Sequence, residues 1–251
     1  MAVIIKGRLI DAKNPLICVP VMGESATEII KKAAELAGSG VEMIEWRADF
    51  FDGLSDSAKV REVLEKLQEI AQKAILLVTV RTKSQGGHAV MSEEELRTLL
   101  IEIAQAHAAD LIDVEYFSFE APGRVIERLQ ERGALVVLSH HDFNETPKRA
   151  VMRTLLSDMA ELDADIIKLA VMPVEMQDVS NLLSITAWFS EENPGTPIIT
   201  MSMGASGVLS RVGGFMFGSC VTFASDGDAT SAPGQLPYTD VSGIIGILKS
   251  L

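Results

Sequence analysis

The sequence predicts one (β/α)8 barrel of the TIM-barrel class, a single domain over residues 1–251. Eight short runs rich in valine, isoleucine and leucine each lead into a charged segment with helical periodicity. Strands that alternate with helices form parallel sheets, and eight such units in about 250 residues match a closed barrel. Polar residues also end many of these runs, and only a closed sheet brings so many strand ends together.

The expected strands are short apolar runs at regular intervals. They span residues 16–22, 41–49, 74–81, 109–117, 134–143, 164–173, 196–204 and 219–225. The expected helices follow them in turn, at residues 26–40, 57–72, 92–108, 122–133, 146–163, 175–193, 206–214 and 241–251. Ser92 and Glu95 form a capping-box pattern at the third helix. Pro147 is typical of a first helical turn and predicts the start of the fifth.

One apolar run, residues 3–10, is left over from the eight units. We expect it to form a strand or hairpin that covers the amino-terminal end of the barrel. Lys6 and Arg8 interrupt its apolar residues, so it does not have the pattern of a signal peptide. No run in the chain reaches the apolar length of a membrane span.

The charge balance limits the kinds of partner. Aspartate and glutamate outnumber lysine and arginine by 35 to 22, a net charge of −13. Such a chain repels nucleic acid and anionic lipid, so a small molecule or a protein is the expected partner. The two cysteines, Cys18 and Cys220, lie in apolar runs and are interpreted as buried side chains in a reducing cytoplasm. No cysteine–histidine spacing predicts a metal site.

Lys168 is the most unusual residue of the predicted strands, because the run ADIIKLAVMP (164–173) is apolar on both sides of it. A strand lysine can extend its stem so that the ammonium reaches solvent or an acidic partner. In a central strand, burial instead lowers the lysine pKa from about 10.4. Because an uncharged amine attacks ketones and aldehydes, Lys168 predicts Schiff-base chemistry.

Three arginines lie near the ends of predicted strands: Arg47 and Arg81 end strands, and Arg211 follows the seventh. Each alone could form a surface ion pair. Together, at one rim of an acidic protein, they indicate an anionic substrate, since a guanidinium binds carboxylate or phosphate through two hydrogen bonds. They would also lower the pKa of a nearby lysine.

His140 and His141 are consecutive in the strand 134–143, so their side chains point to opposite sides. One of them is expected to face the barrel mouth as an acid or base, because histidine titrates near neutrality. The alternation alone does not choose between them.

Two loops near the predicted mouth have open interpretations. Residues 231–237, SAPGQLP, form either a plain connection or a lid whose Ser231 and Gln235 bind a hydroxylated ligand. The glycine-rich residues 204–214 follow the seventh strand, where barrels often hold phosphate, but they lack a helix-opening phosphate fingerprint.

Six motifs in order give a family resemblance. They are EWRAD (45–49), RTKSQGG (81–87), SHHDF (139–143), IIKLAVMP (166–173), TMSMGASGVLSR (200–211) and SAPGQ (231–235). In this the chain resembles the type I 3-dehydroquinate dehydratases over essentially its whole length. The resemblance implies a homodimeric barrel that removes water from 3-dehydroquinate by syn elimination in the shikimate pathway, with no cofactor and no metal.

The resemblance also implies residue roles. Lys168 would form an imine with the substrate ketone, and His141 would be the general acid and base. The residues around the substrate carboxylate and hydroxyls would be Glu45, Arg47, Arg81, Arg211, Ser231 and Gln235.

Two positions depart from the family pattern. Gln85 stands where a glutamate orients the catalytic histidine, and Pro20 stands where a serine is often found, which leaves one substrate or water contact in question. A carboxamide can accept an imidazole N–H but cannot offset imidazolium charge, so His141 is expected to titrate lower.

Two other functions fit the same residues. One is a different class I Schiff-base aldolase acting on a small keto acid or a phosphorylated keto sugar, with phosphate held near Arg211. The other is a non-catalytic barrel that binds a carboxylate metabolite, in which Lys168 is an ordinary ion-pair donor.

Overall fold

Eight parallel strands form a nearly closed barrel in the computed structural model, which describes residues 2–227 and 231–250. The strands are β3 (Leu16–Val21), β4 (Met43–Arg47), β5 (Ile75–Thr79), β6 (Leu111–Glu115), β7 (Leu135–Asp142), β8 (Ile166–Val171), β9 (Ile198–Ser202) and β10 (Val221–Phe223). From β3 to β9 each strand pairs with the next in chain order, and β10 pairs with β3. A bridge between Ile198 and Ser219 joins the last two strands, so the predicted fold is confirmed.

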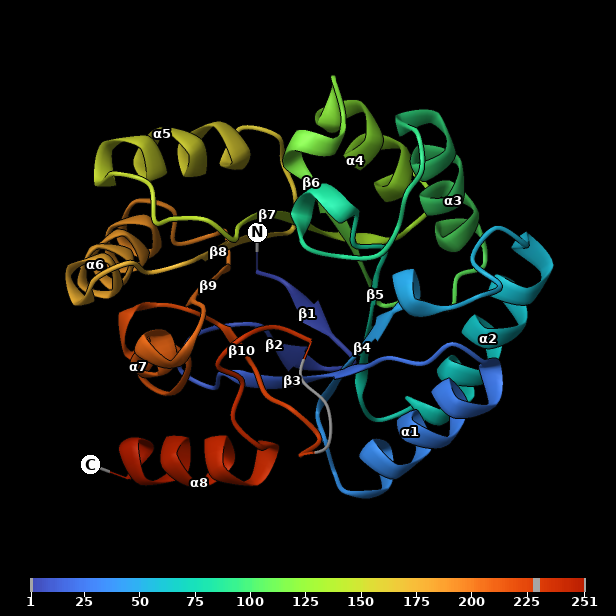
Figure 1. The fold of residues 1–251 in the computed structure, drawn as a ribbon, viewed down its shortest axis with the longest axis horizontal. Helices are drawn as coiled ribbons and strands as arrows, with labels where there is room; N and C mark the ends of the chain where they lie inside the picture. Colours follow the sequence, from blue (N-terminus) through green and yellow to red (C-terminus); the bar gives the residue numbers. More distant parts are fainter. Residues whose placement is uncertain (1, 228–230, 251) are drawn as a thin grey trace.

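Helices surround the strands as a ring (Figure 1). They are α1 (Ala26–Gly38), α2 (Ser57–Ile70), α3 (Glu93–Gln105), α4 (Pro122–Gln130), α5 (Arg149–Ala160), α6 (Met176–Glu192), α7 (Val208–Gly213) and α8 (Tyr238–Lys249). Short 3-10 segments follow several strands, namely η1 (Ala48–Phe50), η2 (Lys83–Gln85), η3 (Tyr116–Ser118), η4 (Ala205–Gly207) and η5 (Gly214–Phe217). All eight predicted strand–helix units are present, with shifted ends.

Two predicted helix starts have different outcomes. The capping box of α3 is confirmed, because Ser92 and Glu95 each accept the other's backbone N–H. The prediction for Pro147 was wrong, since α5 begins at Arg149. Thr146 instead donates its hydroxyl to the carbonyl of Met172, at 2.9 Å. That contact ties residues 145–147 to the end of β8 and delays the helix.

The amino-terminal run forms a hairpin of β1 (Ile4–Ile5) and β2 (Arg8–Leu9). Its two-residue turn has φ of 50° at Lys6 and 77° at Gly7, the left-handed geometry of a tight hairpin turn. Val3, Ile5 and Ile10 are buried against the barrel interior. The Lys6 ammonium donates to the carbonyls of Ala71 and Ala74, which fixes the hairpin to the barrel and confirms its predicted covering role.

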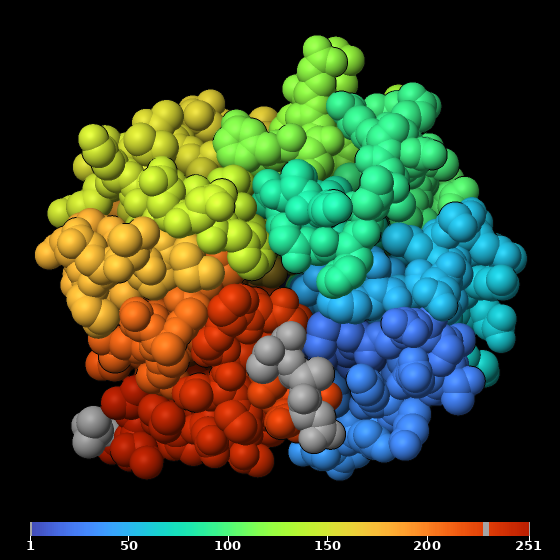
Figure 2. Space-filling view, viewed as in Figure 1, coloured from blue at the N-terminus to red at the C-terminus, as the bar shows by residue number. Residues whose placement is uncertain are grey.

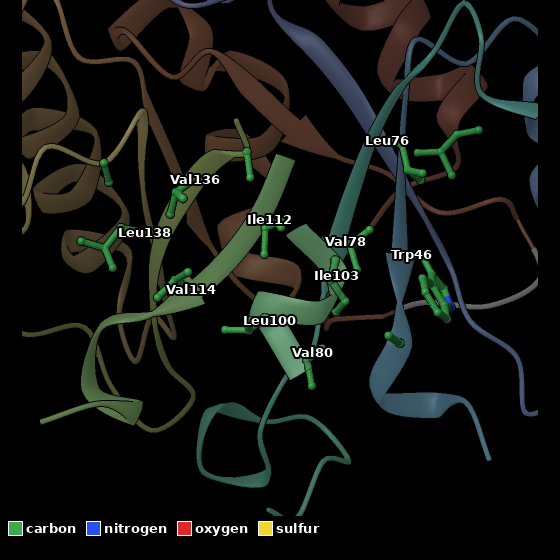
Figure 3. Packing of buried hydrophobic residues seen from close by; sticks show 14 of the residues in the cluster. Trp46, Leu76, Val78, Val80, Leu100, Ile103, Ile112, Val114, Val136 and Leu138 are labelled. Atoms are coloured by element: carbon green, nitrogen blue, oxygen red, sulfur yellow. The ribbon is translucent and has the colours of Figure 1, made fainter. Parts of the chain in front are cut away.

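Strand alternation separates two apolar clusters. Side chains that point outward from the strands pack against the helices, and Figure 3 shows Trp46, Leu76, Val78, Ile112 and Leu138 among them. Side chains of the other parity fill the barrel interior. This inner cluster includes Met43, Ile75, Leu77, Leu111, Val137, Ile166, Ile199 and Phe223.

The same inward parity continues beyond the apolar cluster to the carboxyl ends of the strands. There the inward positions are polar: Glu45 follows Met43 on β4, Asp113 follows Leu111 on β6, and Lys168 follows Ile166 on β8. In Figure 2, segments from distant parts of the chain meet around the centre of the face shown. Within residues 2–227 and 231–250, no helix combines the length and apolar character needed to cross a membrane.

Candidate active site

A pocket lies at the carboxyl ends of the strands, and its empty space, open solvent included, is about 430 Å³. The lining residues come from six strands or the turns after them and from the loop before α8: Glu45, Arg47, Arg81, Gln85, Gly86, His141, Phe143, Lys168, Ala170, Met201, Met203, Phe223, Ser231, Ala232 and Gln235. Eight of the nine predicted site residues are therefore brought together, and Arg211 is the exception.

Lys168 is 3% exposed, and its amine reaches the pocket floor. Burial lowers its pKa, although the carboxylates of Glu45 and Asp113 oppose the shift. The ammonium lies 3.8 Å from Asp113 Oδ2 and 4.3 Å from the centroid of the Phe223 ring. Lys168 therefore releases its proton more readily than an exposed lysine, while groups that stabilise a positive charge stay beside it.

Arg81 is held inside the barrel by two carboxylates. Its guanidinium lies 2.9 Å from Asp113 and 2.9 Å from Glu115, and it also donates to Ser139 at 3.1 Å. Although burial alone would lower the pKa of Arg81, the two carboxylates outweigh it and raise the pKa. The Arg81 charge is therefore largely neutralised, and it fixes Asp113 next to Lys168.

Arg47 and Glu45 line the pocket from β4. Arg47 makes two hydrogen bonds of 2.8 Å to Asp49 and lies over the ring of Phe50. Glu45 accepts a hydrogen bond of 2.8 Å from the Thr79 hydroxyl. Both side chains are buried and held in place before any substrate binds.

Arg211 differs from the other two arginines. It is 1% exposed, and no carboxylate among the described residues pairs with it. Its Nη1 lies 3.7 Å from Met201 Sδ, its Nη2 donates to the Pro233 carbonyl at 2.9 Å, and its Nε has no partner there. Burial lowers its pKa to about 10, so it stays charged at neutral pH. Arg211 is thus a buried cation outside the pocket lining, with no counter-ion within residues 2–227 and 231–250.

His141 is the histidine that faces the pocket, as the alternation required of one of the pair. Its ring is nearly parallel to that of Phe143, at 18° and 6.3 Å between centroids. Burial lowers the pKa of His141 well below its usual range, and the charges of Arg81, Lys168 and Arg47 lower it further. The imidazole is therefore neutral near pH 7 and able to accept a proton. On the paired strands, His141 lies opposite Ala170, one inward position beyond Lys168.

Gln85 holds the backbone of His141 and not its ring. The Gln85 Oε1 accepts the His141 backbone N–H at 2.7 Å, and the Gln85 Nε2 lies 3.4 Å from Nδ1 of His140. The ring atom Nδ1 of His141 is buried with no hydrogen-bond partner in the described part of the chain. The Gln85 carboxamide therefore makes no hydrogen bond to the His141 ring, the contact that the sequence left open to it.

The loop 231–237 lies against the pocket and is more than a connection. Ser231 and Gln235 both line the pocket and bond each other, through Ser231 N–H to Oε1 at 2.9 Å and Nε2 to the Ser231 hydroxyl at 3.0 Å. The Gly204 N–H donates to the Pro233 carbonyl at 3.0 Å. Gly234 passes so close to Gly204 that a Cβ would lie 2.2 Å from its carbonyl oxygen. That residues 231–237 move as a lid stays a prediction.

Several lining residues were not singled out from the sequence. Ala170 and Phe223 line the pocket because they occupy inward positions of β8 and β10. Phe143 also lines it and lies two residues beyond the inward His141. Counting alternate positions along each strand would have found all three residues. Pro20 is buried opposite Glu45 and does not line the pocket. The glycine-rich residues 204–214 pack on β9, where Ser210 caps the backbone of Ser202 at 2.8 Å. Among the described residues, no cluster of three metal-ligating side chains occurs.

Comparison with known proteins agrees with this geometry. The family model for type I 3-dehydroquinase matches residues 17–251. The chain is 38% identical to the 3-dehydroquinate dehydratase of Clostridioides difficile strain 630, over 97% of this chain and 96% of that protein. This chain belongs to the type I 3-dehydroquinase family.

Solved structures of the family share the fold. The 3-dehydroquinate dehydratase from Geobacillus kaustophilus superposes with a TM-score of 0.95 at 35% identity, covering 100% of this chain and 97% of that one. The type I enzyme from Clostridium difficile, crystallised with covalent modified comenic acid, has a TM-score of 0.94 at 37% identity, with coverage of 100% and 98%. All six quoted motifs lie inside the range that the family model matches.

Proposed function

We propose that this chain is a hydro-lyase that converts 3-dehydroquinate to 3-dehydroshikimate and water, a step of the shikimate pathway. Membership of the type I 3-dehydroquinase family supports the reaction. The single observation that carries the mechanism is the buried amine of Lys168, a residue that lines the pocket at the carboxyl ends of the strands.

The first half of the proposed reaction attaches the substrate to Lys168. The unprotonated amine attacks the ketone carbon, and the resulting carbinolamine loses water to give a protonated imine. Lowering of the lysine pKa by burial favours the attack. The nearby Asp113 and the face of Phe223 then stabilise the positive charge of the imine.

The second half is the elimination. His141 removes a proton from the carbon next to the imine, and the C–H electron pair moves into the imine to give an enamine. The enamine expels the hydroxyl, which takes the proton that His141 carries and leaves as water. Because the pKa of His141 is low, the protonated ring is a strong acid for this transfer. Water then hydrolyses the conjugated imine, which releases the product and restores Lys168.

Substrate binding falls to the polar groups around the pocket. Arg211 is assigned the substrate carboxylate, since it is the buried arginine that no carboxylate neutralises in the described residues. A bidentate contact there requires a small shift of Met201 or of the loop at Pro233, which now bond the guanidinium. Glu45, Arg47, Arg81, Ser231 and Gln235 are assigned to the ring hydroxyls and their surroundings.

The oligomeric state, the location in the cell and the domain organisation are also proposed. We assign the chain to a homodimer acting in the cytoplasm, with residues 1–251 working as one domain. The family resemblance supports the dimer, and the two buried free thiols, Cys18 and Cys220, suit a reducing compartment.

Borohydride trapping tests the mechanism. Reduction in the presence of 3-dehydroquinate is expected to leave a covalent adduct on Lys168, located by mass spectrometry of peptides. A phosphorylated ketose is expected to leave no adduct, which separates the proposal from a sugar-phosphate aldolase. Absence of the Lys168 adduct while dehydration proceeds would rule out the imine. Binding of 3-dehydroquinate with neither adduct nor turnover would indicate a non-catalytic barrel.

A further inference from the structure

The carboxamide of Gln85 lies between two consecutive histidines. Its Oε1 is 2.7 Å from the backbone nitrogen of His141, and its Nε2 is 3.4 Å from Nδ1 of His140. Gln85 is 6% exposed, and its own backbone N–H donates to Thr82 at 3.0 Å. The side chain is thus anchored at its base and makes its two polar contacts to neighbouring residues of β7.

The hydrogen-bond roles follow from the donors. A backbone N–H can only donate, so the atom that contacts His141 must be the oxygen of the Gln85 carboxamide. The amide NH2 then faces His140, and an NH2 group also only donates. Nδ1 of His140 must therefore carry no proton, which leaves the ring neutral with its proton on Nε2.

The surroundings of His140 hold the ring in this place. It is half-buried, and it meets the ring of Phe117 edge-on, at 4.8 Å and 80°. Burial lowers the pKa of His140; Asp142 on its own strand and Glu115 on β6 oppose the shift, and Arg81 adds to it. The neighbouring imidazole of His141 also interacts with it. Near neutral pH the ring is thus an acceptor.

We propose that His140 is a positioning residue, whose unprotonated Nδ1 fixes the orientation of the Gln85 carboxamide and thereby the backbone of His141 in the pocket. His140 itself does not line the pocket. It acts through the 3.4 Å contact to Gln85 and the 2.7 Å contact beyond it. The inference rests on the proposed function only in that its kinetic readout is the dehydration carried out by His141.

Protonation of His140 would reverse the arrangement. Two donors, Nδ1–H and the amide NH2, would then face each other, so the carboxamide would have to turn or withdraw. If it turned, its NH2 would face the His141 backbone N–H, and that bond would be lost. The acid side of the pH profile therefore contains the titration of His140 in addition to that of His141.

Two substitutions at one position separate this role from simple packing. In His140→Asn, the amide oxygen Oδ1 is bonded to Cγ, as Nδ1 is in histidine, so it can accept the N–H of Gln85. Unlike the imidazole, the amide does not take up a proton in this pH range. His140→Leu keeps the volume and removes the acceptor. We expect His140→Leu to lower kcat about three- to tenfold, the loss of one buried hydrogen bond, with little change in KM. His140→Asn should restore most of kcat and lose the His140 step of the acid limb.

The coupling to Gln85 gives a second measurement. In a Gln85→Leu background, the change His140→Leu should have little further effect on kcat, because the contact is already missing. Equal losses in His140→Asn and His140→Leu, or additive losses in the double variant, would overturn the proposal. Thermal unfolding of each variant shows whether a loss of kcat reflects misfolding.

Nitrogen-15 NMR of the imidazoles tests the same inference without any substrate. At neutral pH the His140 ring should show an unprotonated Nδ1 and a protonated Nε2. The opposite tautomer would refute the positioning role even if the chain dehydrates 3-dehydroquinate. The expected tautomer in a chain that fails borohydride trapping would leave this inference standing while the proposed function fell.

Discussion

The two ends of the barrel interior are built from the same strands but carry different side chains. At the amino-terminal end the inward positions are apolar, such as Met43, Ile75 and Leu111, and the hairpin covers them with Ile5 and its neighbours. Two residues beyond Met43 and Leu111, the inward positions are the charged Glu45 and Asp113. The amino-terminal end removes apolar surface from water, which stabilises the fold. The other end buries charges, which by themselves cost stability.

At the charged end, the buried cations differ in the carboxylates that lie beside them. Arg47 and Arg81 each have carboxylate partners, so their burial is offset by ion pairs. Lys168 has only a carboxylate at 3.8 Å, and Arg211 has none among the described residues. The two cations left poorly compensated are those assigned to the imine and to the substrate carboxylate. The comparison teaches that stability and chemistry are placed at opposite ends of one sheet.

Lys168→Met tests the charged end most strongly. Removing the amine should reduce kcat on the order of 10⁴-fold or more, because no nucleophile remains. The thermal unfolding temperature should stay equal or rise, since a thioether replaces a poorly paired buried ammonium. Steady-state kinetics and calorimetry measure both effects. A marked fall in stability would show that Lys168 contributes to the fold.

Ile5→Ala makes the opposite change at the amino-terminal end. Ile5 is 4% exposed, so its truncation should lower the free energy of unfolding by about 2–5 kcal/mol. Ile4→Ala is the matched control, because the adjacent Ile4 is 62% exposed and should change stability little. Urea unfolding gives the free energies, and kcat should be unaltered in both variants. Equal destabilisation by the two would contradict the covering role of the hairpin.

Arg211→Met examines the arginine that has no carboxylate partner among the described residues. Loss of a charge-assisted pair to the substrate carboxylate should lower kcat/KM about 10- to 100-fold. Arg211→Lys should recover part of this, because the charge returns without the two-pronged geometry. A cyclic ketone without a carboxylate serves as the control ligand. If Arg211→Met weakened its binding as much as that of 3-dehydroquinate, the carboxylate assignment would be wrong.

Gln85→Glu should produce the smallest change, a displacement of the acid limb of kcat, because the carboxylate can still bond His140 once the ring proton moves to Nδ1. In the native chain the pKa of His141 is lowered, so the neutral base persists and activity falls only at more acidic pH. A carboxylate at position 85 favours the protonated ring and raises that pKa, which moves the loss of activity toward higher pH. A pH–rate profile of both proteins measures the limb. Identical limbs would show that the charge at position 85 does not reach His141.

Much of the fold follows from local pattern. The eight alternating units predicted the barrel because each run of apolar residues has the length of a single strand. The apolar run on both sides of Lys168 predicted that this lysine is buried, and strand alternation predicted that only one of His140 and His141 points toward the mouth. Helix ends were less accurate: the start at Pro147 failed because a distant carbonyl, that of Met172, holds Thr146 outside the helix.

The sequence by itself determined the barrel, the buried lysine and the charged character of the mouth, since these depend on the pattern and spacing of residues along each strand. It also required one inward histidine without choosing between His140 and His141. Only the tertiary structure decided which charges are paired. Arg81 and Arg211 are alike as residues in the sequence, yet two carboxylates from β6 neutralise the first and no carboxylate in the described residues meets the second. It also decided that Gln85 holds a backbone N–H and not a ring. Hydrogen bonds and ion pairs form between strands far apart in the chain, and their partners are set by distances that no local pattern contains.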